Sequence, residues 1–395
     1  MVVYKKLNKS WGYRHKYKNV FTGEKDELKK QGFRTKAEAQ AHFKEAIKNK
    51  DEGYDINPDI TVVEYLNQWM RDYKEGHVAK NTYRQHQRNI DNHIASYFKN
   101  MKLEQLSHPG YQKFINHLLN KVSVKTKEPL SKRTVEIIHT TMYGALYRAK
   151  INKIIIDNPA EGALIYNSKE IVEKRNPNRD LQFIPYDMIE PFLDAAIKDN
   201  YTYYMFFRFL IESGVRKGEA SSLTWSHIDV ENRIITIDQS IDYEAKTDDE
   251  LFSNTKTYRS IRQFKTTSRM IQLLNAHKVR QEDNKARFQD AYKHHLDLVF
   301  CREDGSPIPK STLFNAFRRI LKKAGLPTFK IHSLRHTFAV LMIESGVDMK
   351  FIQEALGHES MQITSDVYSH VSHKIETSSV EKFEKYTEKI IRGDT

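Results

Sequence analysis

The sequence contains the stretch Ile331-His332-Ser333-Leu334-Arg335-His336-Thr337-Phe338-Ala339, in which basic side chains stand at the start of an apolar helix. A spacing of three places His332 and Arg335 on one face of that helix. Three other stretches also concentrate polar residues at the ends of otherwise apolar elements, namely residues 212–229, 254–262 and 356–371. We therefore expect the four stretches to carry the chemistry of the protein together.

These stretches resemble the active-site motifs of the tyrosine recombinase (phage integrase) family, in the same order and with similar spacing. The matched motifs are the first arginine, the lysine of a β-hairpin, a His-x-x-Arg pair, a Leu-Gly-His histidine and a tyrosine ten residues later. The matching residues are Arg216, Lys256, His332, Arg335, His358 and Tyr368. No catalytic position departs from the family pattern, so the resemblance implies an active enzyme.

The residue types suit phosphodiester cleavage, in which negative charge grows on the non-bridging oxygens and is stabilised by fixed cations. Arg216 and Arg335 are suited to this role because a guanidinium binds two phosphate oxygens and stays charged. The resemblance makes Tyr368 the nucleophile. Because an unperturbed tyrosine has a pKa of about 10, it needs a base, and His332 is the candidate.

Three further roles complete the predicted site. Lys256 is the candidate general acid for the 5′ oxygen, His358 is expected to donate a hydrogen bond to the phosphate, and Glu219 is expected to orient the turn that carries the first arginine. Since the nucleophile and the cations are all side chains, this chemistry needs no metal and no other cofactor.

A metal site is the alternative for the histidines. His332 and His336 have a spacing that can bind a metal on a helix, and His358 and His370 could complete the cluster. Arg335 lies beside them, and the glutamate of a zinc protease motif is absent, so the sequence favours the recombinase interpretation.

The chain has 395 residues, enough for two or three domains, and a formal net charge of +13. The excess of basic residues is distributed unevenly along the chain. Residues 1–50 hold 14 basic and 5 acidic side chains, residues 61–165 hold 16 and 9, and residues 166–395 hold 34 and 33. This asymmetry predicts two modules that bind DNA or RNA, ahead of a nearly neutral region. The charge alone is equally compatible with solvated, lysine-rich surfaces.

Residues 1–55 are predicted to form a small α+β domain, a three-stranded sheet followed by a helix capped by Thr35. Aromatic and basic residues alternate over residues 11–17, which is typical of a strand and makes Arg14 and Lys16 candidate DNA contacts. By resemblance this is the arm-type DNA-binding domain of integrases.

Residues 61–165 have a helical pattern throughout and resemble the all-α core-binding domain. Residues 166–180 are predicted to be a linker. Residues 181–395 are predicted to form a mainly α catalytic domain with a small antiparallel sheet and a C-terminal tail helix, which completes the tyrosine recombinase fold. The candidate phosphate contacts of the helical domain are Lys80, Arg84, Arg88, Lys132 and Arg133.

The resemblance implies a site-specific DNA recombinase that integrates and excises a mobile element through a 3′-phosphotyrosyl intermediate and a Holliday junction. Its partners would be double-stranded DNA with core and arm sites, three further copies in a homotetramer, a host DNA-bending protein and a directionality factor. A type IB topoisomerase-like relaxing enzyme and a non-catalytic DNA-binding regulator are the alternatives. No apolar run is long enough to span a membrane, so we expect a cytoplasmic protein on bacterial DNA.

Overall fold

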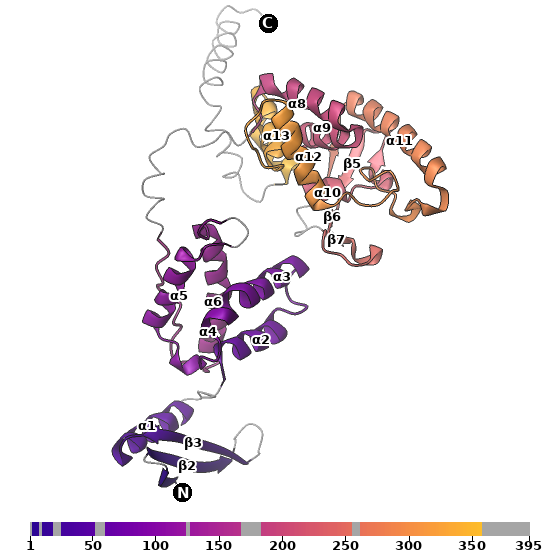
Figure 1. Ribbon diagram of the computed structural model, residues 1–395. Coiled ribbons are helices and arrows are strands. Elements are labelled where there is room, and N and C mark those ends of the chain that lie inside the picture. Colours follow the sequence, from indigo (N-terminus) through magenta and orange to yellow (C-terminus); the bar gives the residue numbers. More distant parts are fainter. Residues whose placement is uncertain are drawn as a thin grey trace, which may run out of the picture. The chain divides into compact units, whose positions relative to one another are not determined.

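The computed structural model describes residues 2–7, 10–18, 25–51, 60–123, 127–166, 183–254 and 261–357 (Figure 1). Lys256, His358, Tyr368, the residues 167–180 of the predicted linker and the predicted tail helix lie outside these ranges. The chain divides into two compact units, Met1–Pro177 and Asn178–Thr395. In the described part, no helix is both long and apolar enough to cross a membrane.

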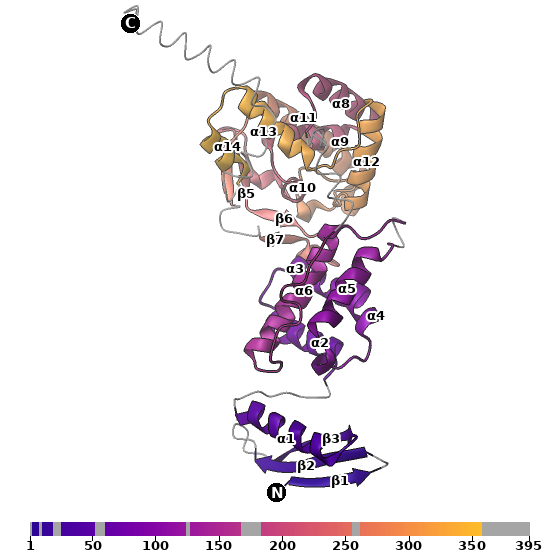
Figure 2. The same cartoon turned by 90° about the vertical axis from the view of Figure 1, so that its left-hand side faces the viewer.

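The N-terminal segment of the first unit is a three-stranded antiparallel sheet with one helix on one of its faces (Figure 2). Its elements are β1 (Val2–Leu7), β2 (Ser10–Lys18), β3 (Lys25–Phe33) and α1 (Lys36–Asp51). Tyr13 fills the space between sheet and helix. The centroid of its ring lies 5.1 Å from that of Phe43, and its hydroxyl oxygen lies 2.9 Å from His42 Nδ1. Thr35 Oγ1 accepts a hydrogen bond from Glu38 N and caps α1. The predicted α+β fold is confirmed.

The remaining described part of the first unit is mainly helical. The elements are α2 (Val62–Tyr73), α3 (Lys80–Asn89), α4 (Ala95–Phe98), α5 (His108–Asn120) and α6 (Lys132–Ile151). An apolar stripe on α2, which includes Tyr65, Leu66 and Trp69, is buried in the core that these helices share. The sequence pattern predicts one continuous helix over residues 82–98, but a π-helical turn at Ile90–Ile94 separates α3 from α4. The turn begins directly after the buried Asn89, whose side chain bonds to α6 instead of solvent.

The second unit is built around α9 (Tyr201–Ser213), in which Phe206, Phe207 and Phe209 are fully buried. The helices around it are α8 (Tyr186–Asp199), α10 (Lys217–Ser221), α11 (Ser268–Phe288), α12 (Lys310–Lys323), α13 (Ser333–Glu344) and α14 (Met349–Leu356). Because α9 is apolar nearly all round, it is stable only where other elements cover every side of it.

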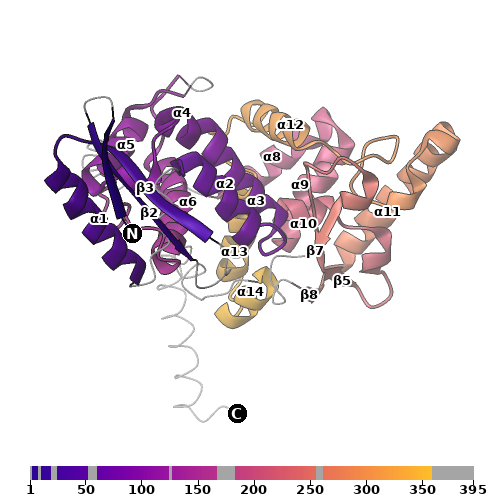
Figure 3. The same ribbon diagram turned by 90° about the horizontal axis from the view of Figure 1, so that it is seen from below.

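Two small antiparallel sheets complete this unit. One has the strand order β4 (Ile228–Asp229), β5 (Ile234–Ile237) and β8 (Arg262–Lys265), and the other pairs β6 (Gln239–Ile241) with β7 (Phe252–Asn254). Figure 3 shows β8 beside β5, with α14 nearby. A mainly helical unit with small antiparallel sheets is the fold predicted for this region.

Gly214 ends α9 and starts the turn toward Arg216. Its φ of +64° lies in the left-handed region, and a Cβ at this position would come within 2.3 Å of Phe338 Cδ1 on α13. Only glycine fits both conditions. The close packing of the α9 end on α13 brings the turn of Arg216 next to the start of α13.

Candidate active site

Three segments far apart in the sequence meet at the end of α14. Arg216, in the turn after α9, donates a hydrogen bond from Nη2 to the carbonyl oxygen of Gly357 over 3.3 Å. Arg335, on α13, donates from Nη2 to the carbonyl oxygen of Leu356. The two arginines expected from the sequence therefore bind neighbouring carbonyl groups at the C-terminus of one helix, where the helix dipole favours cations.

The carboxylate of Glu219 holds both the side chain and the backbone of Arg216. Its Oε1 accepts from Arg216 Nη1 over 2.8 Å, and its Oε2 accepts from the backbone N of Arg216 over 2.9 Å. Glu219 is only 4% exposed. Burial by itself would raise the pKa of Glu219, but the guanidinium groups of Arg262 and Arg216 outweigh it and hold this pKa below its usual value.

Arg262 is a member of this cluster that was not among the predicted site residues. Its Nη2 donates to Glu219 Oε2 over 2.8 Å and its Nε to the carbonyl oxygen of Ala355 over 3.0 Å, with the side chain 7% exposed. The sequence carries one weak signal of it, because Arg262 closes the stretch 254–262 that contains Lys256. Nothing local reveals that the side chain points inward.

Arg335 and Arg216 differ in their access to solvent. Arg335 is 3% exposed and also donates from Nη1 to the carbonyl oxygen of Gly214 over 2.7 Å. Burial, followed by the charge of Arg216, lowers the pKa of Arg335 to about 9, so the guanidinium is still charged at neutral pH. The side chain of Arg216 is 40% exposed, so it can bind an anion that approaches from solvent.

His332 lies at the N-cap of α13, one turn from Arg335, with its ring 4.9 Å from that of His336. The residue is exposed as a whole, but neighbouring protein atoms exclude water from part of its imidazole ring. This desolvation, followed by the charges of His336, Arg335 and Arg216, lowers the pKa of His332 to about 4. The imidazole is therefore neutral at pH 7 and can accept a proton.

The remaining predicted residues border the described cluster in sequence. Lys256 falls in the stretch between β7 and β8, and His358 directly follows Gly357, the residue that binds Arg216. Within the described ranges, no group of three or more histidine, cysteine or acidic residues could hold a metal ion. The alternative metal cluster includes His358 and His370, which lie outside those ranges.

The predicted DNA contacts of the first 55 residues share one face of the sheet. Arg14 and Lys16 lie on the face opposite Tyr13 and α1, together with the exposed Lys5 and Lys29. Arg14 also pairs with Glu27 on the neighbouring strand. Among the side chains that the structure describes on this open face, those of Lys5, Arg14, Lys16 and Lys29 are basic and that of Glu27 is acidic.

The predicted contacts of the helical module lie on two helices that pack against each other. Lys80, Arg84 and Arg88 recur every four residues along α3, and Lys132 and Arg133 open α6. Lys80, Arg88 and Arg133 are exposed, whereas Arg84 and Lys132 are partly buried.

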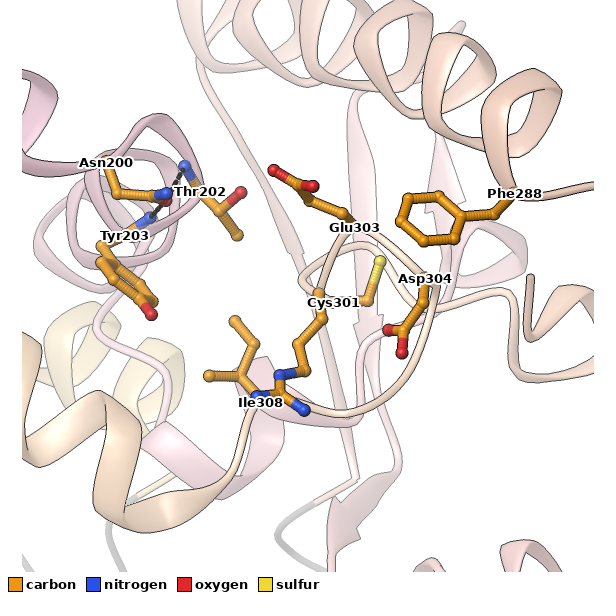
Figure 4. Close-up of a pocket in the computed structure, with 9 residues that line it drawn as sticks. Asn200, Thr202, Tyr203, Phe288, Cys301, Glu303, Asp304 and Ile308 are labelled. Atoms are coloured by element: carbon orange, nitrogen blue, oxygen red, sulfur yellow. Dashed lines mark hydrogen bonds between the residues drawn. The ribbon is translucent and has the colours of Figure 1, made fainter. Parts of the chain in front are cut away.

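A separate hollow of about 330 Å³ lies in the second unit, between the start of α9, the end of α11 and the chain around Cys301 (Figure 4). Its lining residues are Asn200, Thr202, Tyr203, Phe288, Cys301, Arg302, Glu303, Asp304 and Ile308. None of them belongs to the arginine cluster, and Glu303 is paired with Arg287. The cluster around Glu219 is therefore the candidate site.

Known proteins resemble this chain in sequence and in fold. A model described as the phage integrase family matches residues 182–374, and one described as the N-terminal SAM-like domain of phage integrases matches residues 61–119. The chain is 26% identical to a tyrosine recombinase XerC-like protein of Caldanaerobacter subterraneus over 88% of this chain and 89% of that protein. It is 25% identical to the ICEBs1 integrase of Bacillus subtilis over 74% and 75%, respectively.

Solved structures show the same fold. The Tn1549 transposon integrase in complex with transposon right end DNA superposes with a TM-score of 0.63 at 18% identity, covering 82% of this chain and 99% of that one. A lambda integrase tetramer bound to a Holliday junction gives 0.56 at 17% identity, covering 91% and 92%. Family models, relatives and fold agree, and the chain belongs to the phage integrase family of tyrosine recombinases.

Proposed function

We propose that this chain is an integrase that cleaves and rejoins DNA at specific sites through a 3′-phosphotyrosyl intermediate on Tyr368. The observation that carries this proposal is the meeting of Arg216 and Arg335 at the end of α14, directly before His358 in the sequence. Two guanidinium groups held on one short stretch of backbone form a preorganised cationic site for a single phosphate.

The two arginines have different roles at the scissile phosphate. Arg216 is partly exposed and can turn its fork to two non-bridging oxygens. Arg335 donates one hydrogen bond from each terminal nitrogen, to the carbonyl oxygens of Gly214 and Leu356. These bonds fix the guanidinium, so its charge and its remaining N–H groups can stabilise the negative charge that grows on the phosphate. Arg335 therefore needs no reorganisation at the moment of cleavage.

His332 is the proposed base. Its lowered pKa keeps the ring neutral at physiological pH, so it can take the proton of the Tyr368 hydroxyl as that oxygen attacks phosphorus. Lys256 protonates the departing 5′ oxygen, and His358 donates a hydrogen bond to the phosphate. In the reverse step each proton returns, and the phosphotyrosyl bond conserves the energy required for joining a different strand.

The basic surfaces of the first unit supply affinity. The open face of the N-terminal sheet, with Arg14 and Lys16, binds arm sites, and the basic residues of α3 and α6 bind the core site. Four protomers exchange two pairs of strands through a Holliday junction, the assembly in which lambda integrase has been solved. A host bending protein and a directionality factor bring arm and core sites together.

The test is a suicide DNA substrate that traps the covalent complex. Wild-type protein should form a phosphotyrosyl adduct, and Tyr368→Phe should bind the DNA without forming one. Tyr386→Phe is the matched control and should react like wild type. A surviving adduct in Tyr368→Phe would overturn the proposal, and relaxation of supercoiled DNA without paired sites would favour a topoisomerase-like enzyme.

A further inference from the structure

The side chain of Arg262 connects three segments that each border a proposed catalytic residue. Its Nη2 binds Glu219, which in turn holds Arg216, and its Nε binds the carbonyl oxygen of Ala355 near the end of α14. Its own backbone opens β8, one residue beyond the stretch 255–260, which contains Lys256. The register Ile237↔Arg262 fixes this position against β5.

The surroundings make Arg262 difficult to replace. A fork of nitrogen donors reaches Glu219 and Ala355 at once, whereas an ammonium group has one nitrogen and reaches only one of them. Gly357, with a φ of +62°, lies so close that a Cβ there would be 3.4 Å from Arg262 Cδ. The end of α14 is thus packed on this side chain.

We infer that Arg262 is a positioning residue of the active site, which holds Arg216 in place through Glu219 and holds the end of α14 in place through Ala355. It touches no reacting atom in this role. The inference rests on the proposed function, because the residues that it positions are those of the recombinase site.

Removal of Arg262 should slow cleavage without weakening DNA binding. Misplacement of a catalytic group by about 1 Å can cost about 100-fold in rate, so Arg262→Ala should lose single-turnover cleavage by about that factor. The dissociation constant for the core-site duplex should stay near that of wild type. Arg269→Ala, which removes an exposed arginine from the first turn of α11, is the matched control and should cleave like wild type.

A pH profile separates positioning from a general loss of structure. The charged groups that act on Glu219 are Arg262, Arg216 and Arg335, and the titratable imidazole of His332 also faces it. Without Arg262, burial is opposed by less positive charge and the pKa of Glu219 rises. Cleavage by Arg262→Ala should therefore decline as the pH falls, in a range where wild type does not. In the double variant Arg262→Ala with Glu219→Gln, this extra decline should vanish.

Arg262→Lys keeps a charge beside Glu219 but cannot make both contacts, so it should cleave slowly with the pH profile of wild type. This variant also provides the test if Arg262→Ala does not fold. The inference is wrong if wild type forms the adduct and both variants cleave at the wild-type rate, or if the pH profile of Arg262→Ala is unchanged. Failure of wild type itself to form the adduct would instead contradict the proposed function.

Discussion

Arg335 donates a buried hydrogen bond to the carbonyl oxygen of Gly214 over 2.7 Å, across 121 residues of sequence. The bond ties α13 to the turn that leads from α9 to Arg216. One of the two arginines proposed for catalysis is therefore also part of the framework that places the other, whereas Arg216 itself is partly exposed.

This difference predicts distinct effects of two substitutions. Arg216→Ala and Arg335→Ala should both abolish cleavage, but only Arg335→Ala should strongly lower the free energy of unfolding. It leaves the carbonyl groups of Gly214 and Leu356 without this donor, at a cost of roughly 1–3 kcal/mol for each buried group. Differential scanning calorimetry of both variants measures the effect. Equal losses in melting temperature would contradict the prediction.

Gly214→Ala should be far more destabilising than Gly325→Ala. Both glycines have positive φ, so each substitution carries a backbone cost of roughly 1–2 kcal/mol. At Gly325 a new Cβ meets open space, but at Gly214 it would overlap Phe338. Thermal unfolding of the two variants gives the comparison, and similar melting temperatures would show that Phe338 can move aside without cost.

His332 should make the free energy of unfolding depend on pH in the acidic range. Its pKa is about 4 in the folded chain and near 6.5 unfolded, so its contribution is fully present above about pH 6.5 and is lost as the pH falls toward 4. The melting temperature of His332→Gln should therefore fall less steeply than that of wild type over this range. Parallel curves for the two proteins would show that the pKa of His332 is not lowered.

Thr141→Val should loosen the contact between α3 and α6. The buried hydroxyl of Thr141 accepts from Asn89 Nδ2 over 2.8 Å and lies 2.9 Å from His86 Nδ1. Loss of this partner costs roughly 1–3 kcal/mol and should speed amide hydrogen exchange in both helices. Thr140→Val changes an exposed neighbour and should leave exchange nearly unchanged. Equal exchange rates in both variants would argue against a structural role for the network.

The open face of the N-terminal sheet should respond to salt. Lys16→Ala removes one proposed phosphate contact, so binding of duplex DNA should weaken and the slope of log K against log salt should shrink by about 1. Lys44→Ala on α1, which covers the other face, should keep the wild-type slope. Titrations at several salt concentrations measure this, and identical slopes for wild type and Lys16→Ala would exclude the contact.

The sequence alone was enough to predict the fold class and most elements. Apolar spacing is a local property, so the nearly continuous apolar run of residues 201–213 is typical of a buried helix, and the alternation of Ile235 and Ile237 with polar neighbours is typical of a strand. The π-helical turn after Asn89 was missed, because it coincides with a side chain that bonds to a helix 52 residues away.

The candidate site divides in the same way. The order and spacing of the motifs were sufficient to select Arg216, His332 and Arg335, because each motif is a run of neighbouring residues. The inward orientation of Arg262 and the bond from Arg335 to Gly214 depended on the tertiary structure. Strand pairing and the packing of α9 on α13 decide which way these side chains point, and such contacts leave no local trace in the sequence.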